Sequence, residues 1–128
     1  MNKPKLLIVD DEPDMAEFVG EVAEDMGFES IIALNAADCL ELAKTSHPAA
    51  IVMDVVMPNM DGVELVRKLG ESATGLPIIV MSGYEQLYTD MVNTLADNAG
   101  LIILGKLSKP FTATDLEPLL SQVLESME

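Results

Sequence analysis

The segment IVMDVVMPNMDG, residues 51–62, joins the pattern of a buried strand to a carboxylate that needs compensation. An apolar run ends at Asp54, and the turn-forming residues Pro58, Asn59 and Gly62 follow it. Short apolar runs bounded by turn residues are typical of strands in a sheet core. An ionised carboxylate is costly to bury without a partner. The segment therefore predicts a strand whose end carries Asp54 to a site with a compensating charge.

Short apolar runs of the same kind recur along the chain and are rich in Ile, Leu and Val. They are LLIV (6–9), SIIAL (30–34), AAIVM (49–53), PIIVM (77–81) and LIILG (101–105). Most of them do not alternate apolar with polar residues, which favours parallel strands covered on both faces.

Apolar residues at helical spacing fill the intervals between these runs. The first predicted helix runs from Met15 and is closed by Gly27. The second begins at a cap formed by Asn35 and Asp38, and the third at a cap formed by Asp61 and Glu64. A fourth, with a weaker pattern, covers 84–98, and the last begins near Thr112 and Asp115. The last is expected to bury Leu116, Leu119, Leu120, Val123, Leu124 and Met127. Strand–helix alternation of this kind predicts an α/β fold, a doubly wound (βα)5 three-layer sandwich on a parallel five-stranded sheet. At 128 residues the chain is expected to form a single domain, 1–128.

The charge of the chain argues against two classes of partner. Its 22 acidic residues outnumber seven Lys and Arg, and the formal net charge is −15. Nucleic acids and anionic membrane surfaces are bound through clustered basic residues, so we expect neither here. The sequence also has no apolar stretch of the ~20 residues that span a bilayer, and its N-terminal segment turns acidic too early for a signal peptide. We expect a cytoplasmic protein.

The chain contains one cysteine, Cys39, and one histidine, His47. Clusters of Cys and His that bind zinc tightly are therefore excluded. Any metal would have to be a hard ion with oxygen ligands, such as Mg²⁺.

Polar residues stand where the predicted strands end. Asp10 and Asp11 end the first run and Asp54 ends the third, while Ser82 follows the fourth and Lys109 follows the fifth after a short loop. The carboxyl ends of parallel strands share one edge of the sheet, where open α/β folds bind ligands. Neighbouring strands lie ~5 Å apart, so Asp10, Asp11 and Asp54 are expected to converge if the first and third strands are adjacent.

Three close carboxylates raise one another's pKa unless cations compensate them. Lys109 and one Mg²⁺ ion would balance the three negative charges, and magnesium with carboxylates and a lysine is a way in which proteins handle phosphoryl groups. Asp54 stands alone on its strand end, which makes it the best candidate for an aspartate nucleophile that forms an acyl phosphate. Ser82 and Lys109 would then contact the phosphoryl oxygens.

Four segments carry a family resemblance: LLIVDDEPD, IVMDVVMPNMDG, IIVMSG and LSKPF, which span residues 6–111. Together they resemble the receiver domains of bacterial two-component response regulators. The resemblance implies a flavodoxin-like fold with strand order 2-1-3-4-5 and a phosphoacceptor role for Asp54. It also implies that Asp10 and Asp11 bind Mg²⁺, with Asp11 the more direct ligand.

The resemblance extends to other positions of the site. It implies that Val56 offers its backbone carbonyl to the metal, that Ser82 is the Ser/Thr switch and Lys109 the invariant lysine, and that Lys109–Pro110 is a candidate cis bond. The implied activity is transfer of a phosphoryl group from a histidine kinase or phosphotransfer protein to Asp54, without independent substrate turnover. The surface around residues 84–128 would then control a partner or an attached output domain.

One position departs from the family pattern. Lys106 stands where receivers usually carry an aromatic residue, which leaves open a degenerate receiver that acts only as an interaction module. A second alternative is an aspartate-nucleophile phosphohydrolase, although such enzymes have an acid at the position of Val56. Homodimerisation through the last helix and strand is left open.

Overall fold

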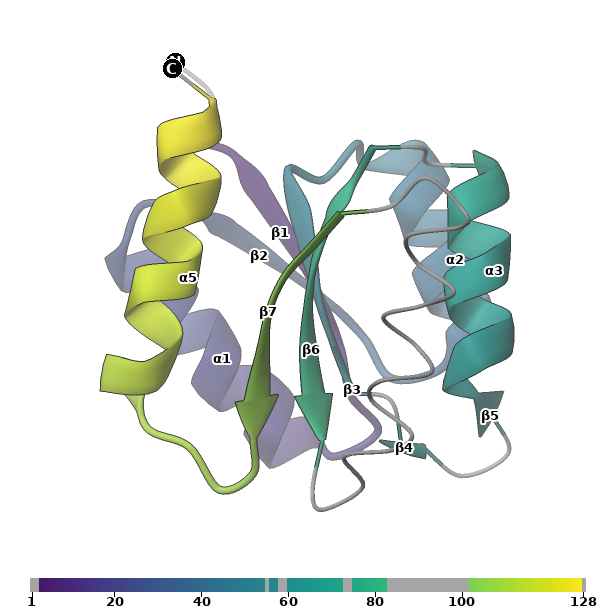
Figure 1. Ribbon diagram of the computed structural model, residues 1–128, viewed down its shortest axis with the longest axis horizontal. Helices are drawn as coiled ribbons and strands as arrows, with labels where there is room; N and C mark the ends of the chain where they lie inside the picture. The colour runs from purple at the N-terminus through teal and green to yellow at the C-terminus, as the bar shows by residue number, and fades with distance from the viewer. Residues whose placement is uncertain (1–2, 55, 58–59, 73–74, 83–101, 128) are drawn as a thin grey trace.

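The computed structural model describes residues 3–54, 56–57, 60–72, 75–82 and 102–127 (Figure 1). The strands are β1 (Lys5–Val9), β2 (Glu29–Ala33), β3 (Ala50–Asp54), β4 (Val56–Met57), β5 (Met60–Asp61), β6 (Pro77–Ser82) and β7 (Ile102–Ser108). The helices are α1 (Pro13–Asp25), α2 (Ala36–Thr45), α3 (Gly62–Ser72) and α5 (Ala113–Ser126). The helix predicted over 84–98 lies outside the described residues.

The main sheet has five strands in the order β2-β1-β3-β6-β7, and every pair of neighbours in it is parallel. When only the five strands of this sheet are numbered along the chain, β6 is the fourth and β7 the fifth, so the order is 2-1-3-4-5 and the predicted fold is confirmed. In register, Val9 lies beside Met53, and Asp54 beside Met81. The strands that carry the predicted site residues therefore end at the same edge.

Helices cover both faces of this sheet, with α1 and α5 on one side and α2 and α3 on the other (Figure 1). Leu6 and Ile8 of β1 pack into the cluster under α1 and α5, whereas Leu7 and Val9 pack under α2 and α3. All four are fully buried. Burial on both faces explains why the strand runs are continuously apolar. Within the part of the chain that is described, no helix has the length and apolar character that a membrane crossing requires.

The helix boundaries follow from local polar contacts that the sequence indicated. The side chain of Asn35 accepts a hydrogen bond from the backbone N–H of Asp38 at 2.8 Å. At the start of α5, the Asp115 carboxylate accepts one from the backbone N–H of Thr112 at 2.9 Å. Each bond satisfies a polar group that a helix end leaves unpaired. Asp61 directly precedes α3, but its side chain is outside the described part.

The last helix departs from its prediction at one residue. Leu116, Leu120 and Val123 are buried as expected, and Leu119 and Leu124 are partly buried against the same cluster. Met127 was expected to face inward but is 54% exposed. It is the residue that caps α5 at its C-terminal end, beyond the part of the helix that packs on the sheet.

Strand β7 is longer than the apolar run from which it was predicted. The run stops at Gly105, but pairing with β6 continues to Ser108, so Lys109 follows the strand directly and not after a short loop. A register shift lies within this pairing, because Ile78 pairs with Ile103 and Ile79 with Gly105. A Cβ atom at position 105 would lie 2.6 Å from Cδ2 of Leu119. Any larger residue at position 105 would therefore force the side chain of Leu119 in α5 to move.

Candidate functional site

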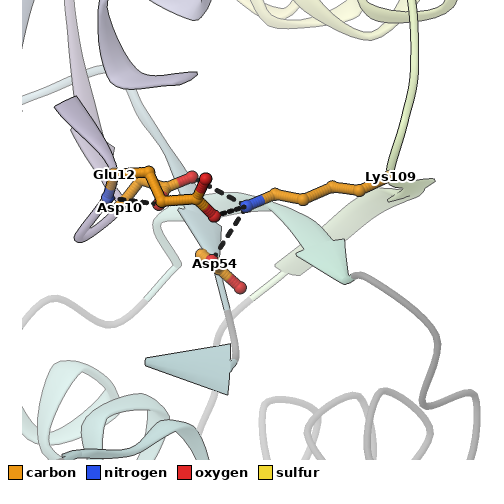
Figure 2. Close-up of polar contacts among 4 residues, drawn as sticks. All are labelled: Asp10, Glu12, Asp54 and Lys109. Carbon is orange, nitrogen blue, oxygen red and sulfur yellow. Dashed lines mark hydrogen bonds and ion pairs between the residues drawn. The ribbon is translucent and has the colours of Figure 1, made fainter. Parts of the chain in front are cut away.

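The acidic residues of the site come from the ends of two adjacent strands, β1 and β3 (Figure 2). Asp10 follows β1 and is completely buried, and Asp54 is the last residue of β3 and is 4% exposed. The Oδ1 atom of Asp10 accepts a hydrogen bond from the backbone N–H of Glu12 at 2.9 Å. This bond ties the carboxylate to the residue that caps the start of α1.

Lys109 reaches into this group of acids from the end of β7 (Figure 2). Its Nζ atom lies 2.9 Å from Oδ2 of Asp54 and 3.0 Å from Oδ2 of Asp10. It also lies 3.6 Å from Oε1 of Glu12. The ammonium group therefore joins three segments of the chain, and its charge offsets part of the cost of burying two carboxylates.

The surroundings of Lys109 act on its pKa in opposite directions. Burial of the ammonium group lowers the pKa, but hydrogen bonds from Nζ to Asp54 and Asp10, together with their charges, outweigh this effect. The net pKa is raised above 10.5. Lys109 is therefore a fixed positive charge at neutral pH.

Four acidic residues gather at the site: Asp10, Asp11, Glu12 and Asp54. Each offers a carboxylate oxygen, and these oxygens all lie within 4.8 Å of one another. A donor set made only of carboxylate oxygens fits a hard divalent cation such as Mg²⁺ and not a soft one. The convergence that was expected for Asp10, Asp11 and Asp54 is thus present in the structure.

Glu12 is a member of the cluster that the sequence reasoning missed. Its side chain is 67% exposed, and it enters the site from the rim by its ion pair with Lys109. In the sequence it reads as an acid before a helix, where carboxylates are common because they favour the helix dipole. The only signal that could have found it is its position directly after Asp10 and Asp11.

Ser82 and Val56 flank Asp54 along the chain and across the sheet. Ser82 is the last residue of β6 and pairs with Ser108 of β7, one position beyond the pair formed by Asp54 and Met81. Val56 begins the two-stranded ribbon of β4 and β5. The side chain of Ser82 lies outside the described part, and the roles expected of both residues stay predictions.

The segment around Lys109 shows two further features. The Lys109–Pro110 peptide bond is cis, as the resemblance implied. Lys106 is exposed and pairs in register with Val80. Cys39 is a buried thiol in α2, and His47 is an exposed residue between α2 and β3.

The comparisons with known proteins agree with this geometry. The family described as response regulator receiver domain matches residues 6–121, and the chain belongs to that family. It is 26% identical over 124 residues to sporulation initiation phosphotransferase F of Bacillus subtilis, covering 97% of this chain and 96% of that protein. It is 30% identical over 121 residues to the regulatory protein AtoC of Escherichia coli, where the match covers 94% of this chain but only 25% of AtoC.

Solved structures show the same fold. A CheY-like receiver domain protein from Methanospirillum hungatei superposes with a TM-score of 0.81 at 25% identity, covering 98% of this chain and 99% of that one. Chemotaxis protein CheY4 of Vibrio cholerae superposes with a TM-score of 0.80 at 26% identity, covering 95% of this chain and 99% of that one. The chain spans about a seventh of another relative, the autoinducer 1 sensor kinase/phosphatase LuxN of Vibrio harveyi, of which it matches 14%. Receiver domains thus occur in relatives much longer than this chain.

Proposed function

We propose that residues 1–128 act as one phosphoacceptor receiver domain, in which Asp54 accepts a phosphoryl group from a histidine kinase or a phosphotransfer protein. The observation that carries the proposal is the pairing of the buried Asp54 carboxylate with Lys109 at 2.9 Å inside a cluster of acidic residues. A purely structural strand end has no need for a buried carboxylate, because an apolar residue there would avoid the cost of desolvation.

The reaction is a transfer between two nucleophiles. A carboxylate oxygen of Asp54 attacks the phosphorus of a phosphohistidine, an O–P bond forms, and the N–P bond breaks with its electron pair left on the imidazole nitrogen. The phosphoryl group carries its charge on oxygens beside the carboxylate. Lys109 already lies against Asp54, so its ammonium group needs only a small shift to pair with one of those oxygens. Ser82 would donate its hydroxyl to another.

Magnesium would be held by Asp10, Asp11 and Asp54, with the backbone carbonyl of Val56 as a further ligand. The oxygen-only donor set of the cluster supports this assignment. When bound, the ion neutralises charge on the phosphoryl oxygens during transfer. Asp10 has a second task, because its Oδ2 atom also accepts a hydrogen bond from Lys109 and so holds the lysine beside the metal site.

The modified domain would act as a switch and not as an enzyme with its own substrate. Phosphorylation turns one negative charge at Asp54 into about two and adds oxygens that recruit Ser82 and Lys109. The surface around residues 84–128 would change in response and control a partner protein or an attached output domain. We propose that it works in the cytoplasm beside its kinase.

The test is phosphorylation by a small donor. Purified protein is incubated with acetyl phosphate or phosphoramidate and Mg²⁺, and its intact mass is measured. We expect the mass of one phosphoryl group to be added, to be lost in Asp54→Asn, and to be kept in Asp25→Asn, which changes an exposed acid at the far end of α1. No added mass in the parent protein would refute the proposal.

The same samples separate the two alternatives. Continuous hydrolysis of a phosphoester that depends on Asp54 would indicate a phosphohydrolase. Phosphorylation of Asp54 with unchanged amide signals throughout residues 84–128 would instead indicate a receiver that serves only as an interaction module.

A further inference from the structure

The loop that carries Lys109 is short and is held at a second point beside the acidic cluster. It joins the end of β7 at Ser108 to the start of α5 at Ala113. Two residues after Lys109, the ring of Phe111 packs against the ring of Phe18 in α1, with centroids 6.0 Å apart and planes tilted by 47°. Both rings are partly buried against the cluster under α1 and α5. An aromatic pair in this range stabilises beyond the area it buries.

Helix α1 connects this ring contact to the acids. Asp10 and Glu12 directly precede α1, and the backbone carbonyl of Glu12 accepts a hydrogen bond from the N–H of Ala16 at 3.1 Å. The same helix that begins at the acids thus carries Phe18 further along. Helix α1 therefore contacts both the segment that carries Asp10 and the loop that carries Lys109, although these two residues are 99 positions apart in sequence.

We propose that Phe18 and Phe111 are positioning residues that hold the loop of Lys109 against α1 and so set the place of its ammonium group over Asp10 and Asp54. The inference deepens the proposed function and rests on it for its role in phosphoryl transfer. A lysine side chain is long and has many rotamers, so fixing its backbone narrows the region that Nζ can reach. Without the ring contact, the ion pairs must order the loop as well as the side chain.

The first experiment needs no phosphoryl chemistry. A double-mutant cycle of Phe18→Leu and Lys109→Met is measured by urea unfolding of the whole chain without magnesium. Lys109→Met lowers the folding equilibrium constant by some factor in the parent and by another in Phe18→Leu. We expect the factor in Phe18→Leu to be smaller by about threefold or more, because the lysine is then already poorly placed. A loss equal in both backgrounds would overturn the inference.

The chain offers a matched control for packing alone. Phe28 is fully buried in the same apolar cluster, but it follows the far end of α1, where its N–H donates to the carbonyl of Ala23. Phe28→Leu removes the same atoms as Phe18→Leu and destabilises the fold. We expect its cycle with Lys109→Met to be additive, and a coupling as large as that of Phe18 would overturn the inference.

The second experiment measures the rate at which phosphoramidate phosphorylates Asp54, divided by the fraction of each variant that is folded. Phe18→Leu and Phe111→Leu should each slow it roughly three- to tenfold, and the double variant should be no slower than the slower single one. Phe28→Leu should match the parent, and Phe111→Tyr, which keeps the ring, should restore the rate. Leucine variants as fast as Phe28→Leu would overturn the inference. A parent that accepts no phosphoryl group would refute the proposed function instead, and the stability cycle would then decide the positioning role alone.

Discussion

At the amino edge of the sheet backbone hydrogen bonds close the chain, whereas at the carboxyl edge charged side chains add to a backbone bond from the N–H of Asp10 to the carbonyl of Ala33 at 3.2 Å. At the amino edge the N–H of Glu29 donates to the carbonyl of Pro4, and that of Ala49 to the carbonyl of Lys5, each at 2.8 Å. At the carboxyl edge Lys109 bonds to Asp54 and to Asp10 across 55 and 99 positions of sequence. The same strands, β1 and β3, take part at both edges.

The difference shows where the fold gives up stability for chemistry. Backbone bonds at the amino edge hold for almost any side chain, because they use groups that every residue but proline has. The ion pairs at the carboxyl edge depend on particular side chains, and each buried charge is tolerable only while its partner is present. This difference between the two edges can be tested by making the same substitution at each of them.

The largest effect is expected from Lys109→Met, set against Lys5→Met at the amino edge. Loss of the Lys109 ammonium leaves Asp10 and Asp54 buried without it, and we expect the free energy of unfolding to fall by about 3 kcal/mol at neutral pH without magnesium. Lys5→Met, at the first residue of β1, should change it by about 0.5 kcal/mol. Urea unfolding measures both. Equal losses at the two edges would contradict the comparison.

A smaller effect is expected from magnesium. An ion that binds the folded chain alone should raise the free energy of unfolding by about 1.4 kcal/mol at ten times its dissociation constant. Asp11→Asn should remove most of this gain, whereas Glu29→Gln, which changes an exposed acid at the amino edge, should keep it. Urea unfolding with and without magnesium, at ionic strength matched with KCl, measures the gain. A gain that survives in Asp11→Asn would place the ion elsewhere.

Much of the fold could be predicted from the sequence because burial on both faces leaves a plain mark. The runs at 6–9 and 49–53 are apolar at every position, and both became central strands. The end of β7 was misjudged because Gly105 and Lys106 interrupt the apolar pattern of an edge strand. Met127 was misjudged because helical spacing does not reveal where the sheet beneath a helix stops. The strand order came from the family resemblance, since periodicity alone carries no information on neighbours.

The centre of the site could also be predicted, but not its rim. Asp10, Asp54 and Lys109 each stand at or directly after the end of a strand, and strand ends of a parallel sheet share one edge, so their meeting follows from topology. Glu12 lies in a polar stretch where an acid needs no explanation. The contact of Phe18 with Phe111 joins residues that look like ordinary core positions in sequence. Such details arise from the packing of one helix on one loop, which no local pattern encodes.

The smallest effect concerns Cys39, whose buried thiol contrasts with the partly buried ammonium of Lys109. Acidic partners raise the pKa of Lys109 and keep it charged, whereas burial alone raises the pKa of Cys39 from 9.0 to about 12 and keeps it neutral. Between those two values the unfolded chain releases a proton that the folded chain retains, so stability must fall as pH rises.

We expect this release to cost the parent about 0.8 kcal/mol of unfolding free energy by pH 9.5, relative to pH 8. Cys39→Ala cannot release that proton, so the difference in stability between parent and variant should shift by the same amount over this range. Urea unfolding of both proteins at the two pH values measures it. A difference independent of pH would mean that the thiol titrates alike in both states, and that α2 covers it less completely than its full burial implies.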